Sequence, residues 1–164
     1  MFNLQSATQL LALLLSGLIA GLFYSYSCSV NPGLGRLVDE AYLRAMQSIN
    51  TAIQKPLFFL SFMGALIILP IVAWMNYAQT GFSFSTGCLI AASLLYAIGV
   101  FGVTIAGNVP LNNILAAFNI DSASPASLHG LRQKFEGPWN GLHSIRTICA
   151  VLTFLLAALP LVRK

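Results

Sequence analysis

The chain has 164 residues, of which 57% are hydrophobic and only 7% are charged. Because a typical soluble domain carries about 25% charged residues, this composition excludes an ordinary soluble protein, a disordered chain and a disulfide-rich secreted scaffold. Eight basic and four acidic residues give a net charge of +4, which is too dilute for a nucleic-acid-binding surface. We therefore expect an integral, multi-pass membrane protein, with residues 1–164 forming a single domain within the lipid bilayer.

Stretches without charged residues predict four membrane spans. Charged residues are absent before Arg36 and again between Lys55 and Asp121. Since a spanning helix needs about 20 apolar residues, the first stretch supplies one span, and the second supplies two, separated at 76–81. The expected fold class is all-α, a four-helix transmembrane bundle. The predicted spans are 7–28, 56–74, 84–106 and 142–162.

The basic residues predict how these spans are oriented. With four spans, the connections at 36–55 and 121–146 lie on one side, and the short turn and both termini lie on the other. Most of the basic residues belong to the two long connections. The positive-inside rule thus predicts cytoplasmic long connections and termini outside. Residues 1–28 lack the basic segment typical of a cleavable signal peptide, so we expect them to be retained.

The connection between the first two spans is predicted to be an amphipathic helix. Its residues recur at spacings of three and four, which places them on one helical face. One interpretation is an interfacial helix that lies on the lipid headgroups. The other adds that Tyr42 and Asn50 point into the bundle, and the sequence leaves both open. The residues of this face are Asp39, Tyr42, Leu43, Met46, Asn50 and Ile53.

The third span leads into a second long connection, between the third and fourth helices. Pro110 cannot donate a hydrogen bond to the carbonyl of Ala106, so we expect the helix to kink or end there. Thr104, Asn108 and Asn112 share a face if the turn continues. The two asparagines either form the rim of a cavity or cap the helix end.

A polar stripe marks the start of the fourth span. Pro138 suits the first turn of a helix, with Glu136 just outside it. At about 100° per residue, the polar side chains fall within an arc of about 120°. A charge inside a span costs about 2.5–3.5 kcal/mol, and Arg146 by itself is explained as a membrane-interface anchor. The stripe contains Trp139, Asn140, His143, Arg146 and Thr147.

The other members of the stripe require partners, because unpartnered buried polar groups cost a few kcal/mol. Residues assigned to the same side of the membrane are Asn50, Asn108, Asn112 and Glu136. Tyr24 and Tyr26 lie near the matching end of the first span. We therefore predict a sheltered polar pocket beneath the two long connections, lined by these residues.

The chain lacks the motifs of several other chemistries. Its three cysteines occur singly, and His129 and His143 are its two histidines, so no metal site is predicted. We expect no cofactor, with haem ligated through His143 as a remote alternative. The deep parts of the spans carry no charge, which argues against an ion pathway.

Several short motifs occur in a characteristic order along almost the whole chain. They are Asn31-Pro32, Met46-Gln47-Ser48-Ile49-Asn50, Asn108-Val109-Pro110-Leu111-Asn112 and Arg132…Phe135-Glu136…Trp139-Asn140…His143…Arg146-Thr147. In this order the chain resembles a family of small four-span membrane proteins that includes the anthrone oxygenases of polyketide pathways.

The resemblance implies oxidation of an anthrone to an anthraquinone by molecular oxygen, without an evident metal or flavin. On this hypothesis His143 and Arg146 are catalytic: His143 removes a proton from the methylene or a phenol of a flat hydrophobic substrate, and Arg146 stabilises the resulting enolate. The expected substrate-binding residues are Asn50, Asn108, Asn112, Glu136, Trp139, Asn140, Tyr24 and Tyr42.

Two other classes of function fit the same residues. One is a non-enzymatic membrane protein that binds a lipid, a quinone or a haem-like ligand. The other is a structural subunit whose polar stripe contacts a second protein. Glycines in the spans permit close helix contacts within the chain or in a homo-oligomer.

Overall fold

The structure is a computed structural model that describes residues 4–162. Over this range it contains helices and no strand. Four helical segments are long and apolar enough to cross a membrane, which confirms the predicted multi-pass bundle. These segments are Leu4–Leu34, Pro56–Thr80, Phe84–Ala117 and Pro125–Val162.

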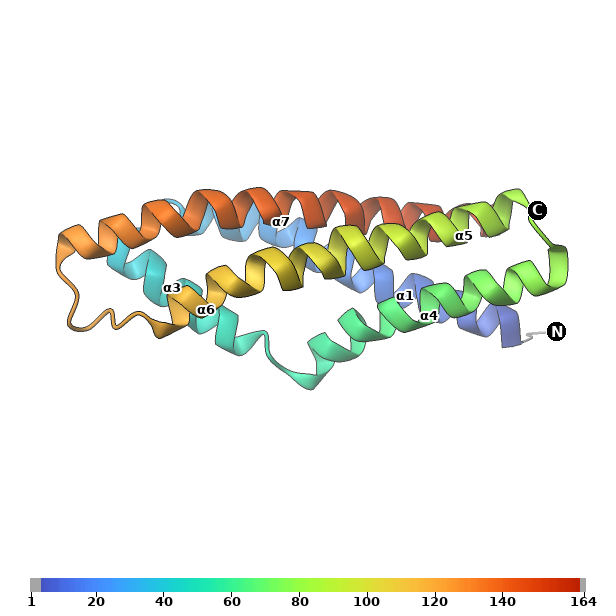
Figure 1. The fold of residues 1–164 in the computed structure, drawn as a ribbon, viewed down its shortest axis with the longest axis horizontal. Helices are drawn as coiled ribbons and strands as arrows, with labels where there is room; N and C mark the ends of the chain where they lie inside the picture. Colours follow the sequence, from blue (N-terminus) through green and yellow to red (C-terminus); the bar gives the residue numbers. More distant parts are fainter. Residues whose placement is uncertain (1–3, 163–164) are drawn as a thin grey trace.

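The helices form an antiparallel ring in which α1 and α5 each pack against both α4 and α7 (Figure 1). The start of α1, the end of α7 and the turn between α4 and α5 lie at one end of the bundle. In chain order, with η for π-helical turns, the elements are α1 (Leu4–Ser25), η1 (Tyr26–Val30), α2 (Asn31–Leu34), α3 (Asp39–Ala52), α4 (Pro56–Thr80), α5 (Phe84–Leu95), η2 (Tyr96–Gly102), η3 (Thr104–Asn108), α6 (Val109–Ala117) and α7 (Pro125–Val162).

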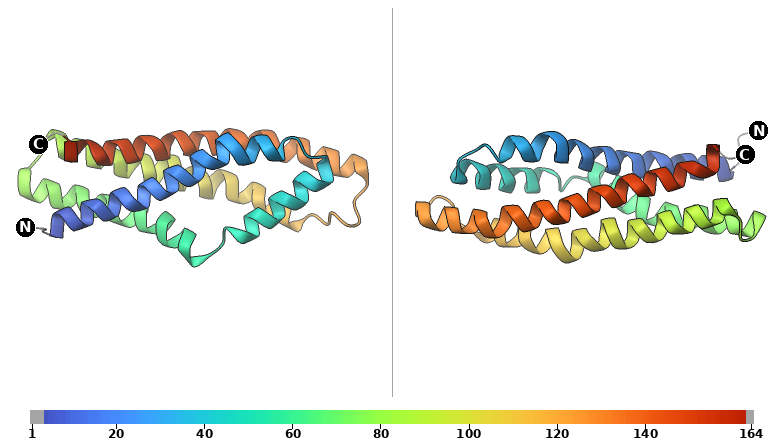
Figure 2. Two further views of the ribbon diagram at one scale, coloured as in Figure 1. Left: turned by 180° about the vertical axis from the view of Figure 1, so that it is seen from behind. Right: turned by 90° about the horizontal axis from the view of Figure 1, so that it is seen from above.

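One column of the bundle is broken into α3 and α4, which meet at an angle (Figure 2). Pro56 is the first residue of α4, and Lys55 before it is extended, with φ −114° and ψ 151°. A residue that precedes proline avoids the helical region, so the chain cannot pass straight from α3 into α4. As a result, α3 packs against α6 and α7, whereas α4 packs against α1 and α5.

The packing of α3 makes it part of the bundle. Tyr42, Leu43 and Met46 are at most 2% exposed and join a buried cluster with Leu115 and Trp139. Each large apolar side chain buried in this way contributes about 1.5–3 kcal/mol. The segment expected as an interfacial helix therefore turns its predicted face inward, as the second interpretation requires.

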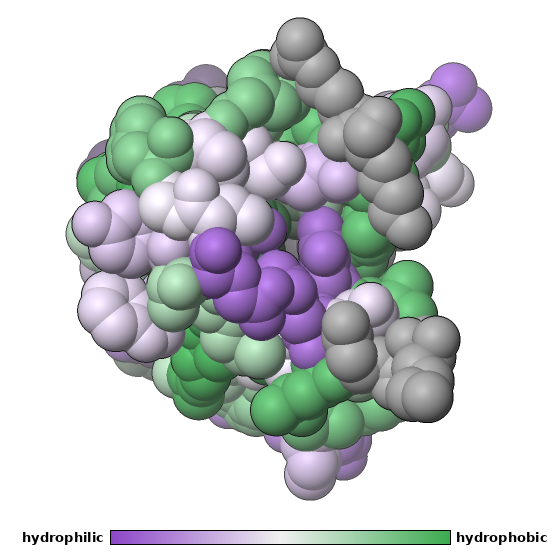
Figure 3. Space-filling view, turned by 90° about the vertical axis from the view of Figure 1, so that its right-hand side faces the viewer, coloured by the Kyte–Doolittle hydropathy of each residue, from purple (hydrophilic) through white to green (hydrophobic). Residues whose placement is uncertain are grey.

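The turn between α4 and α5 comes later than predicted. The helix continues through Asn76 to Thr80, and the chain reverses at 81–83, where Gly81 has φ +67°. Buried Asn76 accepts a hydrogen bond from the Thr86 hydroxyl at 2.8 Å, so a polar residue that suggested a loop stays inside the helix. Viewed from this end of the bundle, hydrophilic residues gather at the centre of the face (Figure 3).

Two prolines widen their helices instead of ending them. The N–H of Asn31 bonds to the carbonyl of Tyr26, and that of Val109 bonds to Thr104, which are π-helical bonds just before Pro32 and Pro110. Such single π turns relieve the missing donor and the steric clash of a proline. Of the two alternatives expected at Pro110, an end of the third span is wrong, because the helix runs on to Ala117.

The fourth span also begins earlier than the sequence suggested. Helix α7 starts at Pro125, so Pro138 lies inside it and not in its first turn. Only 118–124 separates α6 from α7, and most of the long connection expected here is helical.

Candidate functional site

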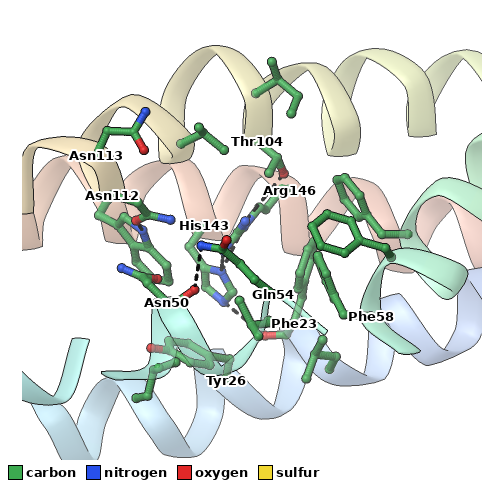
Figure 4. A pocket seen from close by; sticks show the side chains of 18 residues that line it. Phe23, Tyr26, Asn50, Gln54, Phe58, Thr104, Asn112, Asn113, His143 and Arg146 are labelled. Carbon is green, nitrogen blue, oxygen red and sulfur yellow. Dashed lines mark hydrogen bonds between the residues drawn. The ribbon is translucent and has the colours of Figure 1, made fainter. Parts of the chain in front are cut away.

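A cavity of about 320 Å³ lies beside the break between α3 and α4 (Figure 4). This volume is at the lower end of the range of about 300–1,000 Å³ found for small-molecule sites. Its wall is formed by residues from each of the four sides of the bundle, namely α1 with η1, α3 with α4, η3 with α6, and α7. The lining residues are Leu22, Phe23, Tyr26, Ile49, Asn50, Ile53, Gln54, Phe58, Phe59, Phe62, Thr104, Ile105, Val109, Asn112, Asn113, Trp139, His143 and Arg146.

The wall of the cavity combines aromatic surfaces with neutral amides and one cation. Six of its side chains are aromatic rings of phenylalanine, tyrosine or tryptophan, four are carboxamides, and none is a carboxylate. Apolar pockets with a few convergent polar groups are typical of small-molecule sites.

His143 is held as a neutral ring with a defined tautomer. Its Nδ1 lies 3.1 Å from Nε and 3.0 Å from an Nη atom of Arg146. Because arginine only donates, Nδ1 must be the unprotonated acceptor, and Nε2 carries the hydrogen and donates to the Phe23 carbonyl at 3.1 Å. Both nitrogens of this buried ring are therefore occupied.

Arg146 is a buried cation without an acidic partner. Its side chain is 9% exposed, and no carboxylate of residues 4–162 forms a salt bridge with it. Its guanidinium lies 4.4 Å from the centre of the Phe23 ring and 5.2 Å from that of Trp139. A third N–H points to Thr104 Oγ1 at 3.5 Å, which leaves two of its five N–H groups without a protein acceptor in the described structure.

Aromatic rings hold the imidazole on several sides. Trp139 stacks on His143 with ring centres 5.1 Å apart and planes 10° apart. Tyr26 and Phe23 meet the same ring edge-on at 5.2 and 5.6 Å. The indole N–H of Trp139 donates to Asn112 Oδ1 at 2.8 Å, which fixes its orientation.

Two of these side chains lie where π turns begin. Tyr26 is the first residue of η1, and Thr104 is the first residue of η3. Tyr26 packs against His143, and Thr104 lies 3.5 Å from an N–H donor of Arg146.

The structure brings together five of the residues predicted for the site: Asn50, Asn112, Trp139, His143 and Arg146 all line the cavity. Asn108 and Asn140 lie outside its wall. The Asn108 side chain is fully buried and donates to the Trp139 carbonyl at 3.3 Å, and the buried Oδ1 of Asn140 has no partner among the described residues.

Three other predicted site residues are elsewhere. Tyr24 is 61% exposed and does not line the cavity, so the expectation that it forms a wall is wrong, and its neighbour Tyr26 takes that place. Tyr42 is buried under the Arg132 guanidinium, 4.5 Å from its ring centre, and burial raises its pKa. Glu136 accepts a hydrogen bond from Arg132 at 2.7 Å, which makes it a partner of Arg132 and not of Arg146.

The cluster around Arg132 anchors α3 to α7. Arg132 and His129 both donate to Asp39, at 3.0 and 2.9 Å. The His129 hydrogen bond and the nearby Arg132 guanidinium hold the pKa of Asp39 below its usual range. These contacts hold the start of α3 against α7.

Sequence reasoning missed most of the apolar wall. Phe58, Phe59 and Phe62 line the cavity from the first turns of α4, where Phe58 and Phe62 stack at 5.2 Å. Their spacing of four is the one signal that indicates a shared face. In an apolar span, however, such a pair is equally typical of lipid contact.

The site does not fit haem ligation through His143. The one ring nitrogen with a lone pair accepts from Arg146, and the other bonds to a backbone carbonyl. Within residues 4–162 there is also no group of three His, Cys, Asp or Glu side chains arranged to hold a metal ion.

Comparison with known proteins identifies the family. The family model described as anthrone oxygenase matches residues 58–156, which is more than half of the chain. The matched region contains Phe58, Thr104, Asn112, His143 and Arg146, whereas Tyr26 and Asn50 precede it. Neither the search of curated proteins nor that of solved structures returned a match. The chain thus belongs to the anthrone oxygenase family.

Proposed function

We propose that the protein oxidises a flat, hydrophobic phenolic substrate of the anthrone type with molecular oxygen, in the cavity between α3, α4 and α7. The observation that carries this proposal is the buried guanidinium of Arg146, which faces an aromatic cavity and has no carboxylate partner. A buried charge without a partner is costly, so an anionic ligand that supplies the missing charge is strongly favoured.

An enolate provides that charge. When an anthrone loses a proton from its methylene carbon, the negative charge moves largely to the carbonyl oxygen. The two N–H groups of Arg146 without protein acceptors bind this oxygen and lower the free energy of the anion. The aromatic wall, with Trp139 and Phe58 on it, accommodates the flat ring system.

The anion then reduces oxygen. The former methylene carbon gives two electrons to O₂ and forms a carbon–oxygen bond, and the resulting peroxide anion takes up a proton from water to yield a hydroperoxide. Loss of the second proton from this carbon, with cleavage of the oxygen–oxygen bond, produces the new carbonyl and one water. One atom of O₂ enters the product and the other leaves as water.

We assign His143 to positioning and not to proton removal. To act as the base predicted from the sequence, Nδ1 would have to give up its bonds from Arg146 and form a cation beside a guanidinium. Repulsion between these charges disfavours that state. Instead, water accepts the methylene proton, and Arg146 lowers the free energy of the anion that forms.

An isotope experiment tests this function. Purified protein in detergent micelles receives anthrone under ¹⁸O₂, and we expect quinone with one labelled oxygen and one O₂ consumed per quinone. Quinone formation no faster than with heat-denatured protein would refute the enzymatic proposal.

A second candidate is a carrier that binds a phenol or quinone without converting it. The absence of a carboxylate and of a free imidazole nitrogen from the described cavity wall favours this candidate. Saturable binding without O₂ consumption would support it.

We also propose that the end of the bundle with the cavity faces the cytoplasm, on the basis of the basic residues near that end. Single cysteines introduced at exposed Val38 and exposed Phe82 test this orientation by labelling from either side of a sealed vesicle.

A further inference from the structure

The cavity contains a second polar feature that the proposed oxidation does not use. Asn50 lines it from α3, while Arg146 lines it from α7 (Figure 4). The side-chain Nδ2 of Asn50 is buried, and no residue of 4–162 accepts a hydrogen bond from it. An unpaired buried donor destabilises the empty protein and favours a ligand that supplies an acceptor.

The other carboxamides of the wall lack this property. Asn112 is oriented by the bond from the Trp139 indole, and Gln54 donates to the backbone carbonyl of Asn50 at 3.1 Å. Asn113 is exposed. Asn50 is therefore the one carboxamide of the wall, within the described structure, whose buried side-chain nitrogen has no partner.

The helix that carries Asn50 is held firmly in place. Gln47 Nε2 donates to the carbonyls of Leu115 and Phe118 at 2.8 and 3.0 Å, which ties α3 to the end of α6. At the other end of α3, Asp39 pairs with Arg132 of α7. A donor on a fixed helix is preorganised for a ligand atom, since little freedom is lost on binding.

We propose that Asn50 is a specificity-determining residue that donates to a second oxygen of the ligand. The cavity then selects flat polycycles that carry acceptor oxygens on two sides of the ring system, one for Arg146 and one for Asn50. This inference rests on the proposed function only in taking the ligand to be a flat oxygenated polycycle.

Anthrone and anthraquinone form a matched pair of probes, because they share a tricyclic skeleton and the quinone has an additional oxygen across the central ring. The chain also provides its own reporter. Of its two tryptophans, Trp139 lines the cavity, whereas Trp74 is 68% exposed on α4. In a Trp74→Phe background, fluorescence quenching therefore reports on the cavity.

The experiment measures the dissociation constants of anthrone and of anthraquinone for the full chain in detergent, without oxygen. We expect the quinone to bind about three- to tenfold more tightly than anthrone, as one net hydrogen bond would give. In Asn50→Leu the ratio should fall to one or below. Asn50→Asp, which keeps the shape and cannot donate when ionised, should behave in the same way, and Asn113→Leu should keep the ratio.

If the Trp74→Phe protein binds anthrone and anthraquinone with equal affinity, the proposal is overturned, whether or not the Asn50 variants fold. An unchanged ratio in either Asn50 variant, with a monodisperse elution profile and the helical circular dichroism of the parent, would also overturn it. Absence of binding by both probes would overturn this inference together with the proposed function. Selective binding without turnover would support the inference while refuting the oxidation.

Discussion

Replacement of Arg146 by methionine separates a functional charge from a structural one. The variant Arg146→Met keeps a long side chain and removes the guanidinium that faces the cavity. If Arg146 stabilises the enolate, its loss resembles the loss of an oxyanion donor and should lower turnover about 10²- to 10³-fold. Substrate binding should weaken less, because the aromatic wall remains.

The stability of this variant should change little. Arg146 is bonded only to neutral groups, chiefly His143 Nδ1, and each such bond is worth about 1.5–3 kcal/mol. Its contacts with the Phe23 and Trp139 rings add about 0.5–2 kcal/mol. Against these gains stands a desolvation penalty of about several kcal/mol for a buried ion, so the net contribution is close to zero.

The Tm in detergent provides the measurement. For a chain of this size a change of about 1 kcal/mol shifts Tm by about 2–4 °C, and we expect a shift of no more than about 8 °C in either direction. Arg36→Met, which removes an exposed arginine, is the control and should alter neither Tm nor turnover. A large fall in Tm with wild-type turnover in the remaining folded protein would refute the reasoning, because Arg146 would then be a structural cation.

Three further predictions concern other parts of the molecule. His143→Gln retains a donor for the Phe23 carbonyl and an acceptor for Arg146, so turnover should fall less than about tenfold. A loss of about 10²- to 10⁴-fold in turnover assays would instead indicate that His143 acts as a general base. In Gly99→Ala the new Cβ would lie 2.5 Å from the Cys149 sulfur, so thermal unfolding should show a loss of about 1–3 kcal/mol; Gly21→Ala, with nothing within 4 Å, is its neutral control. The lowered pKa of Asp39 stabilises the contact of α3 with α7 above the unfolded pKa of about 3.9, and this stabilisation is lost as pH falls through the folded value. Hydrogen exchange of α3 should therefore accelerate below about pH 4 in the parent and already at pH 7 in Asp39→Asn, and equal protection in both at pH 7 would contradict this role.

The sequence contains enough information for the bundle but not for its helix limits. Charge-free stretches predict four spans because charge is expensive in lipid, and this penalty does not depend on packing. The limits depend on local partners that the sequence does not reveal. Asn76 suggested a turn, yet Thr86 satisfies its side chain and the helix continues. Pro138 suggested a start, yet it lies well inside α7.

The polar stripe of α7 was predictable for a similar reason. Periodicity places His143 and Arg146 on one face, and the cost of burying them implies partners from other segments. Which partners are chosen depends on how the other helices pack around α7, and spacing along one helix does not specify this. Tyr24 and Tyr26 lie about 200° apart on an ideal helix, and in the packed bundle Tyr26 lines the cavity while Tyr24 faces outward.

The broken column explains why the cavity forms at this level of the bundle. A continuous helix in place of α3 and α4 would present side chains at every turn and fill the space beside Arg146. Pro56 forces an extended residue at Lys55, and the column bends away, so that Gln54 and Phe58 border a hollow from its two sides. Helices α6 and α7 pack against α3 beside this bend, and Arg146, a buried cation without a carboxylate partner among residues 4–162, lines the cavity there. Irregular backbone and an isolated charge are each expensive in a membrane protein, and their occurrence at the same place is best explained by a ligand that occupies the hollow.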